Sequence, residues 1–182
     1  MDETETSTAE PPKRSPGEHA PPGVTIDLID TDGRLDARQR AWVVDRAGRA
    51  IAPLGVSGEV RVRVVGDAEM SREHASRLGV EGTTDVLTFD LGGAGGRELD
   101  VDLLVCVDEA CRQARAFEHE PERELLLYIV HGVLHCLGYD DADDASCAAM
   151  HVREDELLEI AGVGATYAPR RGSSERAGGC PS

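Results

Sequence analysis

The segment 125–137 constrains this chain most, because it is apolar on nearly every face. A helix that is apolar all round belongs in the interior of a domain. His131 and His135 stand four residues apart within it, so their imidazoles lie on the same helix face, one turn apart. A buried polar group without a partner costs about 2–7 kcal/mol. The pattern therefore indicates either two separately hydrogen-bonded core histidines or one shared metal ion, and we favour the metal ion.

A third ligand can follow the helix. Gly138 is expected to end it, and the turn after this glycine can bring Asp141 back toward the histidines, which gives the pattern His-x3-His-x5-Asp. Two imidazoles and one carboxylate are a standard ligand set for a catalytic zinc ion, with a fourth position open to water. Asp141 alone matches this spacing. Three other residues could serve in its place: Asp143, Asp144 and His151.

Gly132 separates this pattern from that of the zinc metallopeptidases. Those enzymes share the histidine spacing, but they carry a glutamate directly after the first histidine as general base. A glycine at that position argues against peptide hydrolysis by the same mechanism. A glycine inside a helix also costs about 1 kcal/mol relative to alanine, so we expect another part of the chain to pack closely against it.

The remaining pattern predicts one α+β domain, in which a mixed sheet of about four strands packs with helices and the metal site lies on a buried central helix. In the strand 58–66, alternation directs Val60, Val62 and Val64 inward and Arg61 and Arg63 outward. The other expected strands are 24–29, 82–89 and 99–107. The expected helices are 35–54, 70–78, 109–118 with Asp108 as its cap, 121–138 and 145–160, the last with Met150, Leu157 and Ile160 inward and Glu154, Asp155 and Glu159 outward.

Composition bounds the domain and its surroundings. Residues 1–22 form an acidic, proline-rich leader that we expect to be disordered, 23–163 a metal-dependent hydrolase domain, and 164–182 a disordered tail. No basic n-region precedes an apolar core, and no apolar run approaches the roughly 18–20 residues that span a bilayer, so we expect a cytoplasmic protein with no membrane partner.

The formal net charge of -16 argues against a broad basic surface for nucleic acid. A polyanionic substrate would instead have to meet a local cluster of arginines. The candidates are Arg61, Arg63, Arg72 and Arg77.

Four motifs together resemble the YbeY family, bacterial metal-dependent endoribonucleases involved in rRNA maturation. His131-Gly-Val-Leu-His135-Cys-Leu-Gly138-Tyr139-Asp140 is similar to the family signature His-Gly-x-Leu-His-Leu-x-Gly-Tyr-Asp-His. The segment 84–89, Thr-Asp-Val-Leu-Thr-Phe, resembles the family's Thr-Asp-Val-Leu-Ser-Phe, and Asp102-Leu-Leu-Val-Cys resembles the strand that follows it. Met150-x3-Glu154-x2-Leu157-Leu158 resembles the closing helix, so the likeness covers roughly residues 24–158.

The resemblance implies cleavage of single-stranded RNA, in particular rRNA, with the small ribosomal subunit and its proteins as partners and one zinc ion as cofactor. It implies His131 and His135 as ligands, with Asp141 at the place where the family usually has a third histidine. An arginine shortly before the Thr-Asp-Val-Leu segment is thought to meet phosphate in the family. Arg77 is the nearest equivalent, displaced by about one position, and Arg72 is its rival.

Two other functions remain open at this point. The chain could be a non-catalytic ribosome-assembly factor whose metal is structural. It could also be a metallohydrolase of another ester or amide, because the sequence offers no evident platform for base stacking, with aromatic residues at only 3%.

Overall fold

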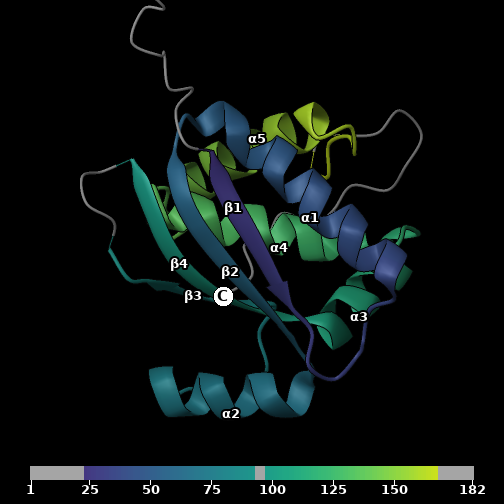
Figure 1. The fold of residues 1–182 in the computed structure, drawn as a ribbon. Coiled ribbons are helices and arrows are strands. Elements are labelled where there is room, and N and C mark those ends of the chain that lie inside the picture. Colours follow the sequence, from purple (N-terminus) through teal and green to yellow (C-terminus); the bar gives the residue numbers. More distant parts are fainter. Residues whose placement is uncertain (1–22, 93–96, 168–182) are drawn as a thin grey trace, which may run out of the picture.

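The computed structural model describes residues 23–92 and 97–167, which form four strands and five α-helices (Figure 1). The strands are β1 (Val24–Ile29), β2 (Ser57–Val65), β3 (Val86–Asp90) and β4 (Glu98–Cys106). The helices are α1 (Ala37–Ile51), α2 (Asp67–Leu78), α3 (Val107–Phe117), α4 (Pro121–Cys136) and α5 (Asp144–Ile160), with a short 3-10 turn η1 (Ala52–Leu54) after α1. The predicted leader 1–22 and residues 168–182 of the predicted tail lie outside the described residues.

The strands form one mixed sheet in the order β1-β2-β4-β3. β1 and β4 both run parallel to β2, whereas β3 pairs antiparallel with β4 and stands at the edge of the sheet. This arrangement confirms the predicted α+β class and the single mixed four-stranded sheet.

The alternation read in β2 is borne out. Val60, Val62 and Val64 are buried and join the main core. Arg61 points to the other face of the sheet, where its guanidinium bonds Asp102 at 2.5 Å and Asp100 at 2.6 Å. Because these carboxylates of β4 neutralise it, Arg61 belongs to an ion-pair cluster on the outer face.

Helix α4 runs through the middle of the main core. It contacts α1, α3, α5, β3 and β4, and all these elements contribute to one apolar cluster (Figure 1). Helix α2 stands apart below the sheet, where Met70 joins a second, smaller cluster. The other buried members of that cluster are Val65, Leu87, Leu104 and Cys106. The predicted central helix is therefore confirmed.

Three sequence predictions for the helices are wrong. Glu154 is fully buried, although its polarity suggested an outward side chain. Its spacing from Met150 and Leu157 places it on the same buried helix face, and that spacing decides its position. Ile160 lies at the last residue of α5 and is 55% exposed, while Leu158 is buried. Asp108 does not cap α3; it instead bonds Arg34.

The end of the described chain is tied to the core. Arg123 Nη2 donates to the carbonyl oxygens of Gly164 and Ala165 at 2.9 and 2.8 Å. The carboxylate of Asp155 accepts from the backbone N–H of Thr166 at 2.5 Å. Among the helices of residues 23–92 and 97–167, none combines the length and apolar character needed to cross a membrane.

Candidate metal centre

The sequence sets both ends of α4. Pro121 stands in its first turn, where a missing backbone N–H is tolerated. Gly138 adopts a left-handed conformation with φ 87°, and the backbone N–H groups of Gly138 and Tyr139 donate to the carbonyls of His135 and Leu134 at 3.0 and 3.1 Å. This pair of bonds is a Schellman motif. The chain therefore turns sharply after His135, as predicted, and carries Asp141 back toward the helix.

The prediction of close packing at Gly132 is also confirmed. A Cβ atom added to Gly132 would lie 2.6 Å from Leu103 Cδ2 and 2.8 Å from Thr88 Oγ1. Leu103 belongs to β4 and Thr88 to β3. The glycine thus lets α4 lie directly on the sheet at the level of the histidines.

Three side chains converge beyond Gly132. His131 Nε2 and His135 Nε2 lie 3.0 Å apart, and Asp141 Oδ2 lies 3.8 and 3.9 Å from them. Donor atoms that bind one zinc ion at about 2.0–2.2 Å are separated by no more than roughly 4.4 Å. All three separations satisfy this limit. The group could therefore hold a metal ion, and its nitrogen and carboxylate donors are the types that zinc accepts.

The other ring nitrogens have fixed partners. His131 Nδ1 lies 2.7 Å from Glu154 Oε1, and His135 Nδ1 lies 3.1 Å from the carbonyl oxygen of Tyr139. A hydrogen bond of this kind places the proton on Nδ1 and leaves Nε2 as the electron-pair donor. The sequence reasoning missed the role of Glu154, and its spacing from Met150 and Leu157 was the signal that could have revealed it.

The acidic side chains around His131 favour a positive charge on its imidazole. Burial by itself lowers the pKa of His131, but the hydrogen bond and charge of Glu154, together with the charges of Asp85 and Asp141, outweigh burial and raise that pKa. A metal cation at Nε2 would meet the same negative surroundings.

The rival third ligands are engaged elsewhere. Asp143 caps α5, accepting from the backbone N–H groups of Ala145 and Ser146 at 2.9 Å each. The ring of His151 stacks on Tyr167 with centroids 3.7 Å apart. Neither of these residues, nor Asp144, belongs to the convergent group in the described part of the chain. Asp141 is thus the candidate that the geometry favours.

The three donors border a pocket of about 500 Å³. His135 and Asp141 remain 30% and 22% exposed, so the group is open on the pocket side. Arg77 lines this pocket, whereas Arg61, Arg63 and Arg72 do not. The other lining residues are Leu78, residues 84–89, His131 and Ala142.

Arg77 reaches the pocket from the last turn of α2. Its guanidinium carbon lies 4.9 Å from the centre of the Phe89 ring, within the range of a cation–π contact. Its Nε atom donates to Glu73 Oε2 at 3.4 Å. The side chain is nevertheless 58% exposed, so its guanidinium is accessible from solvent.

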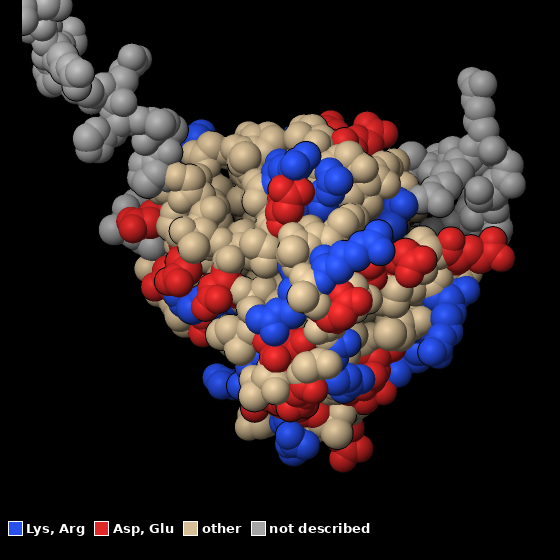
Figure 2. Space-filling model, turned by 45° about the vertical axis from the view of Figure 1, so that its right-hand side comes forward, with Lys and Arg blue, Asp and Glu red and all other residues tan. Residues whose placement is uncertain are grey.

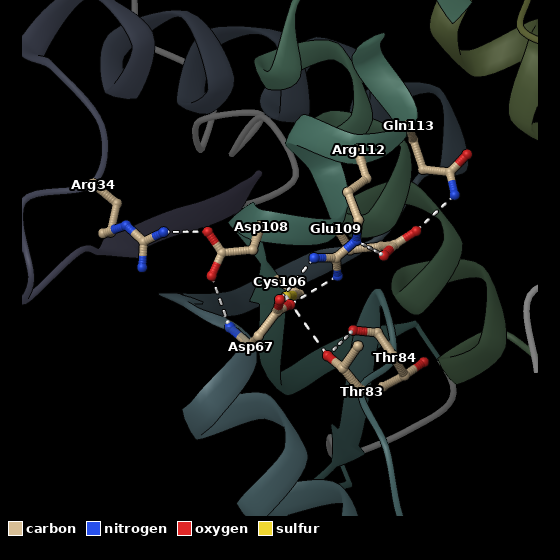
Figure 3. A network of polar contacts seen from close by, with 9 residues as sticks. All are labelled: Arg34, Asp67, Thr83, Thr84, Cys106, Asp108, Glu109, Arg112 and Gln113. Atoms are coloured by element: carbon tan, nitrogen blue, oxygen red, sulfur yellow. Dashed lines mark hydrogen bonds and ion pairs between the residues drawn. The ribbon is translucent and has the colours of Figure 1, made fainter. Parts of the chain in front are cut away.

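A polar network fixes the beginning of α2 (Figure 3). Arg112 of α3 forms a two-bond pair with Asp67, at 2.7 and 2.8 Å, and its Nε donates to Glu109 at 2.7 Å. Asp108, which pairs with Arg34, accepts from the backbone N–H of Asp67 at 2.9 Å. The hydrogen bond from Arg112 lowers the pKa of Asp67 below its usual value. The network joins α2 to α3 and to the loop after β1.

Charges of both signs are mixed on the face shown in Figure 2, with red and blue side chains next to one another. This face carries no continuous basic surface. The observation agrees with the net charge of -16. Among the residues that line the pocket, Arg77 is the arginine.

Comparison with known proteins identifies related chains. A family model described as Endoribonuclease YbeY matches residues 33–162. Endoribonuclease YbeY of Chloroflexus aggregans is 33% identical over 150 residues, covering 75% of this chain and 94% of that protein. Endoribonuclease YbeY of Moorella thermoacetica is 39% identical over 127 residues, covering 63% of this chain and 80% of that protein.

One solved structure shows a similar fold. The solution structure of TM1509 from Thermotoga maritima matches with a TM-score of 0.55 over 75% of this chain and 88% of that chain. The two sequences are 24% identical in this comparison, so the likeness concerns the fold alone.

Proposed function

Because this chain belongs to the YbeY family of endoribonucleases, we propose that it is a zinc-dependent endoribonuclease that cleaves single-stranded RNA during rRNA maturation. The observation that supports this proposal most strongly is the convergence of His131, His135 and Asp141 beside an open pocket that also receives Arg77. The proposed setting is the cytoplasmic small ribosomal subunit, in its assembly or quality control.

The donor set suits one zinc ion held by His131 Nε2, His135 Nε2 and Asp141 Oδ2. When bound, zinc supplies Lewis acidity toward water and toward an oxygen of the phosphodiester. Glu154 and the Tyr139 carbonyl hold the two imidazoles in the tautomer that binding requires.

Arg77 has the charge and the accessibility to neutralise the phosphodiester in the proposed reaction. Its guanidinium lines the same pocket as the donors and is 58% exposed. An arginine beside a reacting phosphate stabilises the negative charge that develops in the transition state. Arg72, the rival candidate, lies on the same helix but does not line the pocket.

The openness of the site bears on the alternative of a structural metal. Structural zinc sites usually have four protein ligands and are closed, whereas catalytic sites keep one position accessible. The convergent group contains three residues of the described chain, and two of them are exposed to the pocket. This geometry favours a catalytic site over a purely structural one.

The test is the variant His135→Ala with His151→Ala as a matched control. His151 is a histidine outside the convergent group. We expect His135→Ala to lose both its metal and the cleavage of single-stranded RNA, while His151→Ala retains both. Cleavage by metal-free His135→Ala at the wild-type rate would contradict the proposed mechanism.

Two further assays separate the alternatives. A panel of RNA, peptide and phosphoester substrates distinguishes an endoribonuclease from a hydrolase of another ester or amide. A folded double variant, His131→Ala with His135→Ala, should fail to support rRNA processing in cells. If that variant supported normal processing, binding alone would be sufficient and the assembly-factor function would be favoured.

A further inference from the structure

The Arg77–Phe89 pair is a feature that the sequence did not reveal. The two residues are twelve positions apart and come from different elements, α2 and β3. In the fold, the guanidinium carbon of Arg77 lies 4.9 Å from the centre of the Phe89 ring. Both residues line the pocket that contains the candidate metal ligands.

The ring of Phe89 packs on the apolar residues between α2 and the sheet. It packs against the small apolar cluster that includes Met70, Leu87 and Leu104. Arg77 is held over the ring by this contact and by its bond to Glu73. The ring therefore gives Arg77 a surface to pack on, while more than half of the arginine side chain remains open to solvent.

The surroundings suit a flat, weakly polar ligand. Leu78, directly after Arg77, also lines the pocket and is 62% exposed. An exposed guanidinium plane next to apolar surface is a known way for proteins to hold a nucleobase, because the base stacks on it without any need for sequence-specific hydrogen bonds.

The Arg77–Phe89 pair and the candidate metal centre lie on opposite sides of β3. Thr88 packs on Gly132, beside His131, whereas Phe89 is the next residue of the same strand. Successive side chains of a strand point to opposite faces. Since β3 is the edge strand, the metal ligands and the Arg77–Phe89 pair lie on the two sides of an exposed strand edge within one pocket.

We propose that Arg77 and Phe89 form a stacking platform for one unpaired nucleobase of the RNA substrate: the base covers the guanidinium face opposite Phe89, while the N–H edge of the same group meets the phosphodiester at the metal centre. This inference rests on the proposed endoribonuclease function and specifies how its substrate is recognised. A base that stacks on Arg77 has left the stack of its own strand and has no paired partner. The platform therefore selects single-stranded over double-stranded RNA.

The experiment measures binding of full-length protein to fluorescently labelled six-nucleotide single-stranded RNAs by anisotropy. One RNA is intact, and each of six others lacks the base at one position. Measurements are made on the protein as purified and again with a chelator, and strand integrity is checked on a gel. Stacking contributes about 1–3 kcal/mol per base, so one abasic position should weaken binding to the wild type roughly tenfold.

The variants Phe89→Leu and Arg77→Lys test the platform itself. The first keeps an apolar side chain without the aromatic ring, and the second keeps the charge without the planar group. Both should bind the intact RNA roughly tenfold more weakly than the wild type does. Neither should distinguish the intact RNA from the abasic RNA that binds the wild type most weakly. Arg72→Lys, an exposed arginine on the same helix, should behave as the wild type does.

The outcomes separate this inference from the proposed function. If every abasic RNA bound the wild type as tightly as the intact RNA, or if Phe89→Leu retained the wild-type pattern, the platform would be refuted even where cleavage persisted. If the abasic pattern appeared but no RNA were cleaved, the platform would stand and the proposed catalytic function would fail.

Discussion

Helices α4 and α2 both contribute to the pocket, but they are held in different ways. In α4 every residue from Glu124 to Leu134 is buried, and the helix touches three other helices and two strands. In α2 only Met70 and His74 are buried, and the helix is tied to the rest of the domain by Met70 in the small apolar cluster and by the polar network at its start (Figure 3). Two of the three candidate ligands, His131 and His135, thus lie on the most densely packed helix, and Arg77 lies on the most loosely packed one.

This difference matches the demands of the two roles. A metal site needs donor atoms fixed to within a fraction of an ångström, and the dense packing of α4 holds the backbone of His131 and His135 in place. A side chain that contacts a flexible RNA strand can tolerate movement, and local openings of a weakly packed helix permit it. We therefore expect substitutions in α4 to affect stability and metal affinity strongly, and substitutions at the start of α2 to affect local dynamics.

The largest effect is expected for Gly132→Glu, which would introduce the glutamate of the metallopeptidase pattern. Its side chain would have to displace Thr88 and Leu103 and would bury a carboxylate without a partner. We expect the free energy of unfolding to fall by at least ~3 kcal/mol, with no gain of peptidase activity. Chemical denaturation monitored by circular dichroism measures the loss.

Gly132→Ala is the control for size alone. Its methyl group meets the same atoms, but alanine gains about 1 kcal/mol of helix propensity against an overpacking cost of about 1–3 kcal/mol. A net loss of roughly 1 kcal/mol is expected. Wild-type stability in the glutamate variant would show that α4 is not held tightly against the sheet.

Next in size is Glu154→Ala. The substitution removes the hydrogen-bond partner of His131 Nδ1 inside the core. We expect metal affinity to fall roughly 10–100-fold, as measured by competition with a chromophoric chelator. Glu154→Gln keeps an acceptor oxygen and should lose less. Glu156→Ala, on the exposed side of α5, serves as the matched control, and equal losses in both alanine variants would contradict the role of Glu154.

The smallest effect is expected for Arg112→Ala at the start of α2. Exposed ion pairs contribute about 0.2–1 kcal/mol, so amide hydrogen exchange in the first turns of α2 should quicken only a few-fold while α4 is unchanged.

The same ion pair predicts a pH dependence. Because the pKa of Asp67 is lowered in the fold, the stability that Asp67 contributes is present above its unfolded pKa of about 3.9 and is lost as pH falls through the lower folded value. Acid should therefore loosen the start of wild-type α2 before α4. Faster exchange in α4 at the same pH would contradict the comparison.

The same contrast explains what the sequence could predict. The apolar spacing predicts α4, Gly138 predicts the turn that ends it, and Gly132 predicts its close contact with another part of the chain. These features depend on neighbouring residues and on local backbone geometry. Family membership, the α+β class and the mixed sheet were also predicted correctly.

The partners of the site depend on distant parts of the chain, so the sequence showed them poorly. The polarity of Glu154 predicts an outward side chain, whereas its helical spacing from Met150 predicts the buried position that the fold shows. The contact between Arg77 and Phe89 could not be predicted, since it depends on how α2 docks beside β3. Local pattern thus revealed the candidate ligands, and only the fold revealed what surrounds them.

The most direct test of the central claim is elemental analysis of the purified wild-type protein and of Asp141→Ala, together with cleavage of single-stranded RNA by each. The convergence of three donors predicts about one zinc ion per wild-type chain, and loss of most metal and most cleavage in Asp141→Ala. A variant that retained both its zinc and its activity would contradict the assignment of Asp141 as the third ligand. A wild-type protein that cleaved RNA without any metal would contradict the metal centre as a whole.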